Sequence, residues 1–223
     1  MKNKVLVVAT HLDDETLGCG GSLLRYKAEG ADIHWLLVTE PTIDLGYDTE
    51  RLKEREKKVY QVSEMYGFES IHRLRFPAAQ LDRASQSELI KAIAAIFREV
   101  CPSIIYLPFC HDVHSDHRIV FDASYSAAKT FRAPYLKRIL MMETLSETEF
   151  SVSIQSQAFS PNVFVDVTDY FDKKLDIMNV FSDELGAHPF PRSLEHLKAL
   201  AIHRGATAGC RLAEAFVLLK ETI

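Results

Sequence analysis

Cysteine is scarce in this sequence, and its spacing offers no disulfide or redox pattern. Four cysteines occur among 223 residues, none of them in a C-x-x-C arrangement, so we interpret them as free thiols. Cys110 precedes His111, which raises the alternative of a nucleophile beside its base. Adjacent side chains on an extended segment point apart, so we favour a plain buried thiol at Cys110.

Basic residues are not in excess, and long apolar runs are missing. The chain has 26 Lys and Arg against 31 Asp and Glu, a net charge of −5, without the basic stripe of nucleic-acid binders. We therefore expect neither nucleic acid nor an anionic membrane as a partner. The first apolar run, residues 5–9, is too short for a signal sequence or a membrane span, so we expect a cytoplasmic protein.

The sequence also lacks internal repeats, low-complexity tracts and Pro/Ser-rich linkers, so we expect a single domain over residues 1–223. Strand-like and helix-like segments alternate along nearly the whole chain, which predicts an α/β fold with a mainly parallel sheet. The expected strands are residues 4–9, 33–39, 70–76, 103–107, 138–143, 162–167 and 215–219. The expected helices are residues 22–27, 51–66, 88–100, a segment beginning near 116, 169–181 and 194–203.

Two clusters of imidazoles and carboxylates follow apolar runs. His11-Leu12-Asp13-Asp14-Glu15 comes after residues 5–9, and a second cluster, residues 112–117, comes after residues 104–107. Loops that leave the carboxyl ends of parallel strands gather in one crevice. We therefore expect the two clusters to meet and to supply the parts of a hydrolytic metal site.

The first candidate role for these side chains is metal binding. Catalytic zinc commonly takes three His or carboxylate ligands and keeps one position open for water. His11, one carboxylate of the Asp13-Asp14 pair and His117 supply such a set, and the other carboxylate would accept a proton from the bound water. The same set suits ferrous iron, but nothing else in the sequence indicates oxygen chemistry, so we favour zinc. Taken alone, the acidic pair is equally consistent with capping the helix that follows.

The second cluster contributes two histidines three residues apart. His114 and His117 lie on one face if a helix has begun there, and near the mouth of the crevice otherwise. A solvated pair of loop histidines is the alternative, but the arrangement of both clusters after strands favours a site. His117 would then be the ligand. His114, if protonated, would stabilise an oxyanion or protonate a leaving amine.

The stretch Gly18-Cys19-Gly20-Gly21 has two interpretations. It resembles in part the phosphate loop of dinucleotide-binding folds, but the acidic motif separates it from the strand and would repel a pyrophosphate. We therefore expect the glycines to let a helix pack closely on the sheet.

The chain resembles the PIG-L/LmbE-like metal-dependent N-deacetylases of sugar conjugates. The family motif His-Pro-Asp-Asp-Glu followed by Leu-Gly-x-Gly-Gly corresponds to residues 11–21, and Asp-x-His-x-Asp-His corresponds to residues 112–117. Weaker similarities lie at residues 142–144, 162–167, 174, 203–205 and 213–216. The resemblance implies a Rossmann-like fold with helices on both faces of the sheet, and removal of an N-acetyl group from a small-molecule amino-sugar conjugate.

The resemblance also implies roles for individual residues. It assigns zinc, or another divalent ion such as Fe²⁺, to His11, Asp14 and His117, with Asp13 as general base and His114 as the electrostatic or acid partner. Asp116 would orient a histidine. The candidate substrate-binding residues are Arg55, Glu40 and Asp112.

Two departures from the family pattern concern activity and specificity. Leu12 replaces the usual proline of the first motif, which removes stiffness but no ligand, and Glu40-Pro41 stands where the family has a glycine near the substrate. Two alternatives therefore remain beside an N-acetyl sugar deacetylase: a non-catalytic sugar- or nucleotide-binding module, and a metal amidase acting on a non-sugar acyl amide. A homo-oligomer is compatible with all three.

Overall fold

A seven-stranded sheet in the order β3-β2-β1-β4-β5-β7-β6 forms the centre of the molecule. The computed structural model describes residues 2–152, 154 and 157–223. Strands β1 to β5 pair in parallel, and β7 runs antiparallel to both of its neighbours. The predicted α/β fold with a mainly parallel sheet is therefore confirmed. The strands are β1 (Lys4–Ala9), β2 (Asp32–Glu40), β3 (Ser70–Pro77), β4 (Ile104–Leu107), β5 (Arg138–Met142), β6 (Val163–Asp166) and β7 (Ala213–Glu221).

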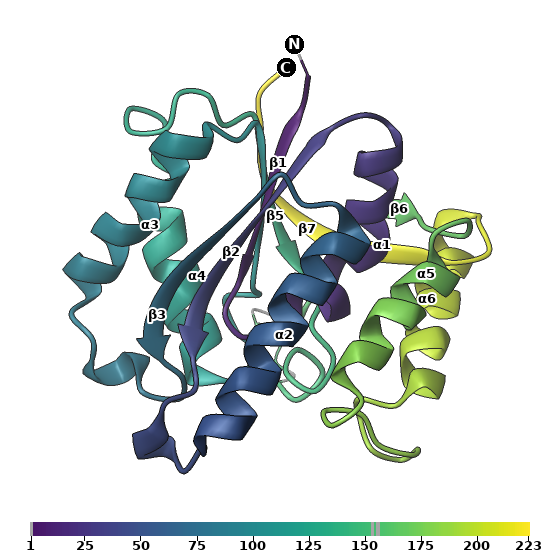
Figure 1. The fold of residues 1–223 in the computed structure, drawn as a ribbon. Helices are drawn as coiled ribbons and strands as arrows, with labels where there is room; N and C mark the ends of the chain where they lie inside the picture. The colour runs from purple at the N-terminus through teal and green to yellow at the C-terminus, as the bar shows by residue number, and fades with distance from the viewer. Residues whose placement is uncertain (1, 153, 155–156) are drawn as a thin grey trace.

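Helices cover both faces of this sheet (Figure 1). One core contains side chains of α1, α2, α5 and α6 together with Val5 and Val7 of β1, and the other contains those of α3 and α4 with Leu6 and Val8. The alternation along β1 follows from the period of two in a strand. The helices are α1 (Asp14–Ala28), α2 (Thr49–Tyr66), α3 (Gln86–Val100), α4 (Ser115–Ala127), α5 (Phe171–Met178) and α6 (Leu194–Ala208), with short 3₁₀ turns at Ile43–Leu45, Leu81–Arg83 and Asn179–Phe181.

Helix α1 differs from the prediction, which began a helix only at Ser22. The helix starts at Asp14 and includes the glycines, with a kink at Cys19 where the backbone leaves helical geometry (φ −146°, ψ 20°). The glycines do permit close packing: a Cβ at Gly18 would lie 2.7 Å from Met142 Sδ, and one at Gly21 would lie 2.8 Å from Val167. The sequence did not predict a helix here because glycine has a low helix propensity, whereas tertiary packing stabilises the helix in the folded protein.

The sheet order explains where a site can form. The strand order reverses between β1 and β4, and in open α/β sheets ligands bind in the crevice at such a switch point, beyond the carboxyl ends of the strands. Both polar clusters follow these two strands. Among the described residues, no helix has the length and apolar character that a membrane span requires.

Candidate metal centre

The turn after β1 and the segment before α4 bring three side chains to one point at the switch position. His11 Nδ1 lies 3.3 Å from His117 Nε2, and the same His117 nitrogen lies 3.3 Å from Asp14 Oδ2. His11 Nδ1 and Asp14 Oδ2 are 4.0 Å apart. Ligand atoms 2.0–2.2 Å from a tetrahedral ion lie roughly 3.4 Å from one another. The three predicted ligands thus form a candidate metal-binding group.

Neighbouring carboxylates fix which histidine nitrogens face this point. Asp112 Oδ2 accepts a hydrogen bond from His117 Nδ1 at 2.8 Å, and Thr148 donates to the other Asp112 oxygen. Asp116 Oδ2 lies 3.3 Å from His11 Nε2. A carboxylate only accepts, so the outward nitrogens carry the protons and the inward nitrogens present lone pairs. When both imidazoles are neutral, two lone pairs and the Asp14 carboxylate converge, an arrangement suited to a bound cation.

The pKa values of Asp14 and His117 also favour a positive charge between these two side chains. Burial raises the pKa of Asp14, but His117 and His11 outweigh it and hold that pKa well below its usual range. Burial lowers the pKa of His117, yet Asp14 and Asp112 raise it well above the usual value. A proton on His117 thus occupies the position that a metal ion would take, and metal binding would release that proton.

Asp13 occupies the N-cap position of α1, but its side chain makes no capping hydrogen bond. Its backbone adopts a positive φ of 111°, and its buried carboxylate accepts a hydrogen bond from Arg192 Nη1 at 3.1 Å. Burial and the Asp14 carboxylate raise the pKa of Asp13 well above its usual range, while Arg192 acts in the opposite direction. The capping interpretation of the acidic pair therefore finds no support, since Asp14 also turns its carboxylate back to His11 N at 2.8 Å.

His114 lies beside the group as the N-cap of α4. Its Nδ1 accepts a hydrogen bond from Asp116 N at 3.1 Å, so the proton of the neutral ring sits on Nε2. Burial and His11 lower the pKa of His114 to about 4, which makes the ring neutral at neutral pH. His114 can therefore donate from Nε2 in its neutral form, and the role expected of it on condition of a protonated ring does not need that proton.

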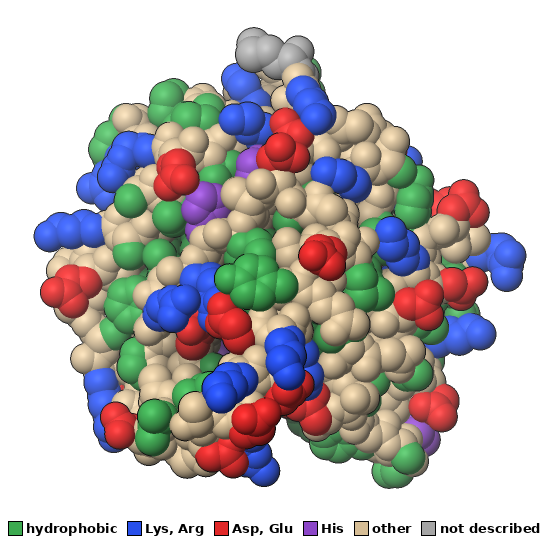
Figure 2. Space-filling model, in the orientation of Figure 1, with side chains coloured by type: hydrophobic (Ala, Val, Ile, Leu, Met, Phe, Trp, Pro, Cys, Tyr) green, Lys and Arg blue, Asp and Glu red, His purple; other side chains and the backbone are tan. Residues whose placement is uncertain are grey.

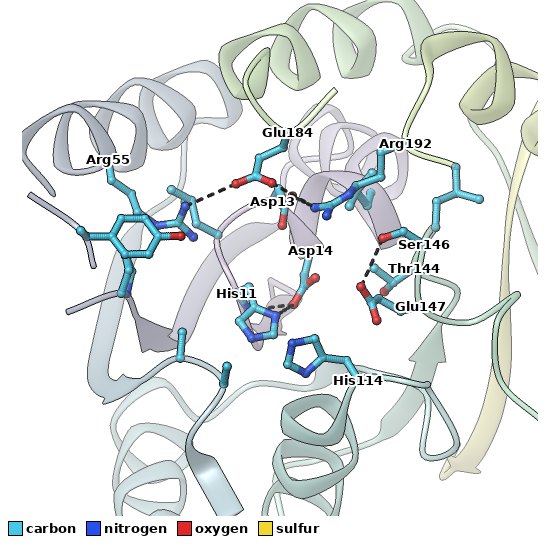
Figure 3. A pocket seen from close by; sticks show the side chains of 17 residues that line it. His11, Asp13, Asp14, Arg55, His114, Thr144, Ser146, Glu147, Glu184 and Arg192 are labelled. Carbon is cyan, nitrogen blue, oxygen red and sulfur yellow. Dashed lines mark hydrogen bonds and ion pairs between the residues drawn. The ribbon is translucent and has the colours of Figure 1, made fainter. Parts of the chain in front are cut away.

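A cavity of about 230 Å³ opens over these residues (Figure 3). His11, Asp13, Asp14 and His114 line one part of it. The remaining polar lining comes from three other regions of the chain: Tyr47 and Arg55; Thr144, Ser146 and Glu147; and Glu184 and Arg192. The cavity thus combines a candidate metal group with hydrogen-bonding side chains suited to a polar ligand.

The candidate substrate-binding residues do not all reach this cavity. Arg55 lines it, as expected. Glu40 does not, because Arg73 Nε draws its carboxylate away at 2.5 Å. Asp112 is fully buried behind His117 and serves that imidazole. In this structure Glu40 forms an ion pair with Arg73 and Asp112 orients His117, while their contacts with a substrate stay predictions.

Three residues with clear positions in the site were missed from the sequence. Arg192 contacts Asp13, Glu184 pairs with Arg192 at 3.4 Å, and Thr148 donates to Asp112. None belongs to a motif, and each lies in a turn or loop without periodicity. Only the proline-rich character of residues 189–191 marks the Arg192 segment as a structured loop.

A family comparison bears directly on this centre. Residues 6–128, more than half of the chain and including both polar clusters, match the family described as PIG-L: GlcNAc-PI de-N-acetylase. The chain belongs to the PIG-L family. The resemblance inferred from the two motifs is therefore confirmed.

Individual relatives cover nearly the whole chain. The diacetylchitobiose deacetylase of Thermococcus kodakarensis is 26% identical to this chain. The alignment is 224 residues long, gaps included, and covers 95% of this chain and 81% of that protein. A probable N-acetyl-α-D-glucosaminyl L-malate deacetylase 2 of Bacillus anthracis is 25% identical over 195 residues, covering 82% of this chain and 83% of that one. The crystal structure of the conserved protein TT1542 from Thermus thermophilus superposes with a TM-score of 0.80 at 27% identity, covering 100% of this chain and 97% of that chain.

Proposed function

We propose that this protein is a zinc-dependent deacetylase that hydrolyses the N-acetyl group of an amino-sugar conjugate. The convergence of His11, Asp14 and His117, each presenting an acceptor atom to one point beside a buried carboxylate, carries this proposal. Membership of the PIG-L family and the deacetylase names of two relatives support the reaction class. Zinc suits the donor set of two imidazoles and one carboxylate.

A zinc ion held by these three side chains would polarise the amide carbonyl and make water easier to deprotonate. Asp13 would take the proton from the attacking water, because its buried carboxylate has a raised pKa and lines the cavity. The water oxygen would bond to the carbonyl carbon, and the C–N bond would then break to release acetate and the amine. The proton held by Asp13 would pass to the leaving nitrogen.

Other residues of the cavity would orient the amide during this reaction. His114 Nε2–H would donate to the carbonyl oxygen as negative charge develops on it. Arg192 would hold the Asp13 carboxylate in place. Within the described part of the chain, Thr144 Oγ1 and Arg192 Nε are buried without a hydrogen-bond partner, so both are available to polar groups of a ligand.

Two competing functions keep the same geometry but predict different chemistry. A non-catalytic sugar- or nucleotide-binding module would show no turnover and no response to chelator. A metal amidase for a non-sugar amide would release a carboxylic acid from small acyl amides but not from N-acetyl sugars. The polar lining of the cavity favours a sugar over a non-sugar amide, and the converging His and Asp side chains favour catalysis over binding alone.

The decisive experiment measures metal content and acetate release on the same protein. We expect about one zinc per chain in the wild type and acetate release from N-acetylglucosamine compounds, with both lost in His117→Ala. His203→Ala, a change of an exposed histidine in α6, serves as the matched control and should retain both. The proposal would be contradicted if the wild-type protein still contained no metal after zinc was added back. It would also be contradicted if the His117→Ala variant still released acetate.

A further inference from the structure

A second cavity adjoins the one over the metal group. It has a volume of about 640 Å³ and lies between the N-terminal half of α2 and the segment 182–184. The two cavities share three lining residues: Tyr47, Arg55 and Glu184. The first cavity, at about 230 Å³, is smaller than the roughly 300–1,000 Å³ usual for ligand pockets. A ligand seated on the metal group would therefore extend across the shared residues into this groove.

We propose that the groove is a second subsite, which receives an uncharged sugar unit joined to the N-acetylated one. This inference rests on the proposed deacetylase function and narrows its substrate to neutral oligosaccharide-like conjugates, rather than free monosaccharides, phosphorylated sugars or glycolipids. Three properties of the groove carry it: the boundary with the first cavity, the balance of charge and the absence of aliphatic lining.

The boundary consists of a chain of ion pairs, visible as dashed lines in Figure 3. Arg55 Nη1 lies 3.8 Å from Glu184 Oε1, and Glu184 Oε2 lies 3.4 Å from Arg192 Nη1. Such loose, partly exposed pairs contribute little stability. Their remaining N–H groups and carboxylate lone pairs can therefore turn to the hydroxyls of a ligand at small cost.

The charge of the groove disfavours an anionic ligand. Five carboxylates line it against three cationic side chains. Lys58 forms an ion pair with Asp183, and Glu50 and Glu54 pair with lysines one turn along α2. Figure 2 shows the resulting mixture of acidic and basic side chains over α2. A phosphate or carboxylate would have to compete with the carboxylates already held in these ion pairs, whereas uncharged hydroxyls would find both donors and acceptors.

The lining also disfavours a lipid. Among the described residues that form the groove, none has an aliphatic side chain, and Tyr47 is the single aromatic one. Tyr47 stands at the boundary with the first cavity and presents a rigid ring with a polar tip. An aromatic ring among charged planar groups matches the alternating apolar faces and hydroxyl edges of a sugar ring.

A block of the groove tests the inference without touching the metal group. Ser182 is exposed and lines only the groove, so Ser182→Trp should fill it without disturbing the core. Ser87→Trp, at an exposed position of α3 on the other face of the sheet, is the matched control. The substrates are N-acetylglucosamine, N,N'-diacetylchitobiose and N-acetylglucosamine 1-phosphate, each with the zinc-loaded enzyme.

We expect kcat/KM for the disaccharide to exceed that for the monosaccharide and the 1-phosphate by at least about 10-fold, which corresponds to 1.4 kcal/mol. Ser182→Trp should remove this advantage and leave the monosaccharide rate unchanged, while Ser87→Trp should change neither. A preference for the 1-phosphate, equal rates on all three compounds, or equal losses on mono- and disaccharide in Ser182→Trp would overturn the groove assignment.

Calorimetric titration with the disaccharide separates this inference from the proposed reaction. Binding that Ser182→Trp weakens, in a protein that releases no acetate, would contradict the deacetylase function but support the groove. Absence of disaccharide binding to the wild type would overturn the groove, whatever the activity on the monosaccharide.

Discussion

At the scale of single residues, Asp13 has the most unusual surroundings in the site. Its carboxylate is 3% exposed, lies next to a second carboxylate in the sequence and is held by one guanidinium. The Asp13→Asn variant keeps the shape of the side chain but removes the base. We expect unchanged zinc content and a loss of acetate release of at least about 100-fold, measured by steady-state kinetics and elemental analysis. Turnover near the wild-type rate would show that another group accepts the proton.

Arg192 is the second residue with a testable role. Its guanidinium lies between Asp13 and Glu184, so Arg192→Met leaves both carboxylates without this partner and frees Asp13 to rotate. We expect kcat to fall on the order of 10- to 100-fold, since a small misplacement of a catalytic group has effects of that size. Arg192→Lys should recover part of the loss.

The control for this prediction is Arg98→Met, an exposed position in α3. It should leave kcat unchanged. If Arg192→Met alters only KM, Arg192 contacts the substrate but does not position Asp13.

At this scale the prediction followed from the position of the two motifs after strands of a parallel sheet. That position predicted one site for His11, His117 and one carboxylate of the Asp13-Asp14 pair, the family resemblance pointed to Asp14, and the structure places the three donor atoms together. Arg192 could not be predicted, since a lone arginine in the loop before α6 has no periodicity or motif to mark it. The family resemblance placed Glu40 near the substrate, but its ion pair with Arg73 on β3 could not be predicted from the sequence.

At the scale of secondary-structure elements, a buried ion pair lies beside the kink in α1. Glu214 of β7 accepts hydrogen bonds from Gly21 N and Ser22 N at 2.8 Å, and so caps the second half of α1. Lys174 of α5 bonds Glu214 at 2.7 Å and Leu17 O at 3.0 Å. The pair thus ties α5 and β7 to the helix that carries Asp14.

Removing only Lys174 should lower the free energy of unfolding more than removing the charges of both Lys174 and Glu214. We expect Lys174→Met to lower the free energy of unfolding by about 3–5 kcal/mol, because it leaves a buried carboxylate without its cation. The double variant Lys174→Met/Glu214→Gln should be more stable than Lys174→Met alone. Urea unfolding measures both, and Lys173→Met, at the exposed neighbouring position, gives the baseline. Equal stability of the two lysine variants would show that the ion pair is dispensable.

Element boundaries were predictable where apolar periodicity was strong. Helix α3, with its single apolar stripe, begins two residues before the expected start and ends at the expected residue, Val100. The predicted helix was shorter than α1 because three glycines, at positions 18, 20 and 21, favour a loop by their local propensity. The side chains of Met142 and Val167, which leave no room for a Cβ at Gly18 and Gly21, come from distant parts of the chain, so local propensity does not encode this close packing.

At the scale of the whole molecule, the metal group joins two halves of the sheet. His11 and Asp14 follow β1, while His117 lies in the first turn of α4, the helix after β4. A metal ion that binds these three side chains only in the folded protein would stabilise that state. We expect chelator treatment to lower the thermal midpoint of the wild type, by the equivalent of about 2–3 kcal/mol when zinc is at 100 times its Kd.

Scanning calorimetry with and without chelator measures this effect, and His117→Ala should show no difference between the two conditions. A wild-type midpoint that chelator leaves unchanged would mean that no ion stabilises the fold.

The strand order that creates this arrangement was not predictable from the sequence, since pairing between strands is set by long-range packing. The antiparallel placement of β7 has the same origin.

The separation of the ligands along the chain has a consequence for folding kinetics. His11 and His117 lie 106 residues apart in the sequence, and only the pairing of β1 with β4 brings them together. Neither histidine has a competent partner set before that pairing forms. The rate of metal uptake during refolding would therefore report one event, the pairing of β1 with β4. This rate can be followed by the optical signal of bound cobalt or of a zinc indicator.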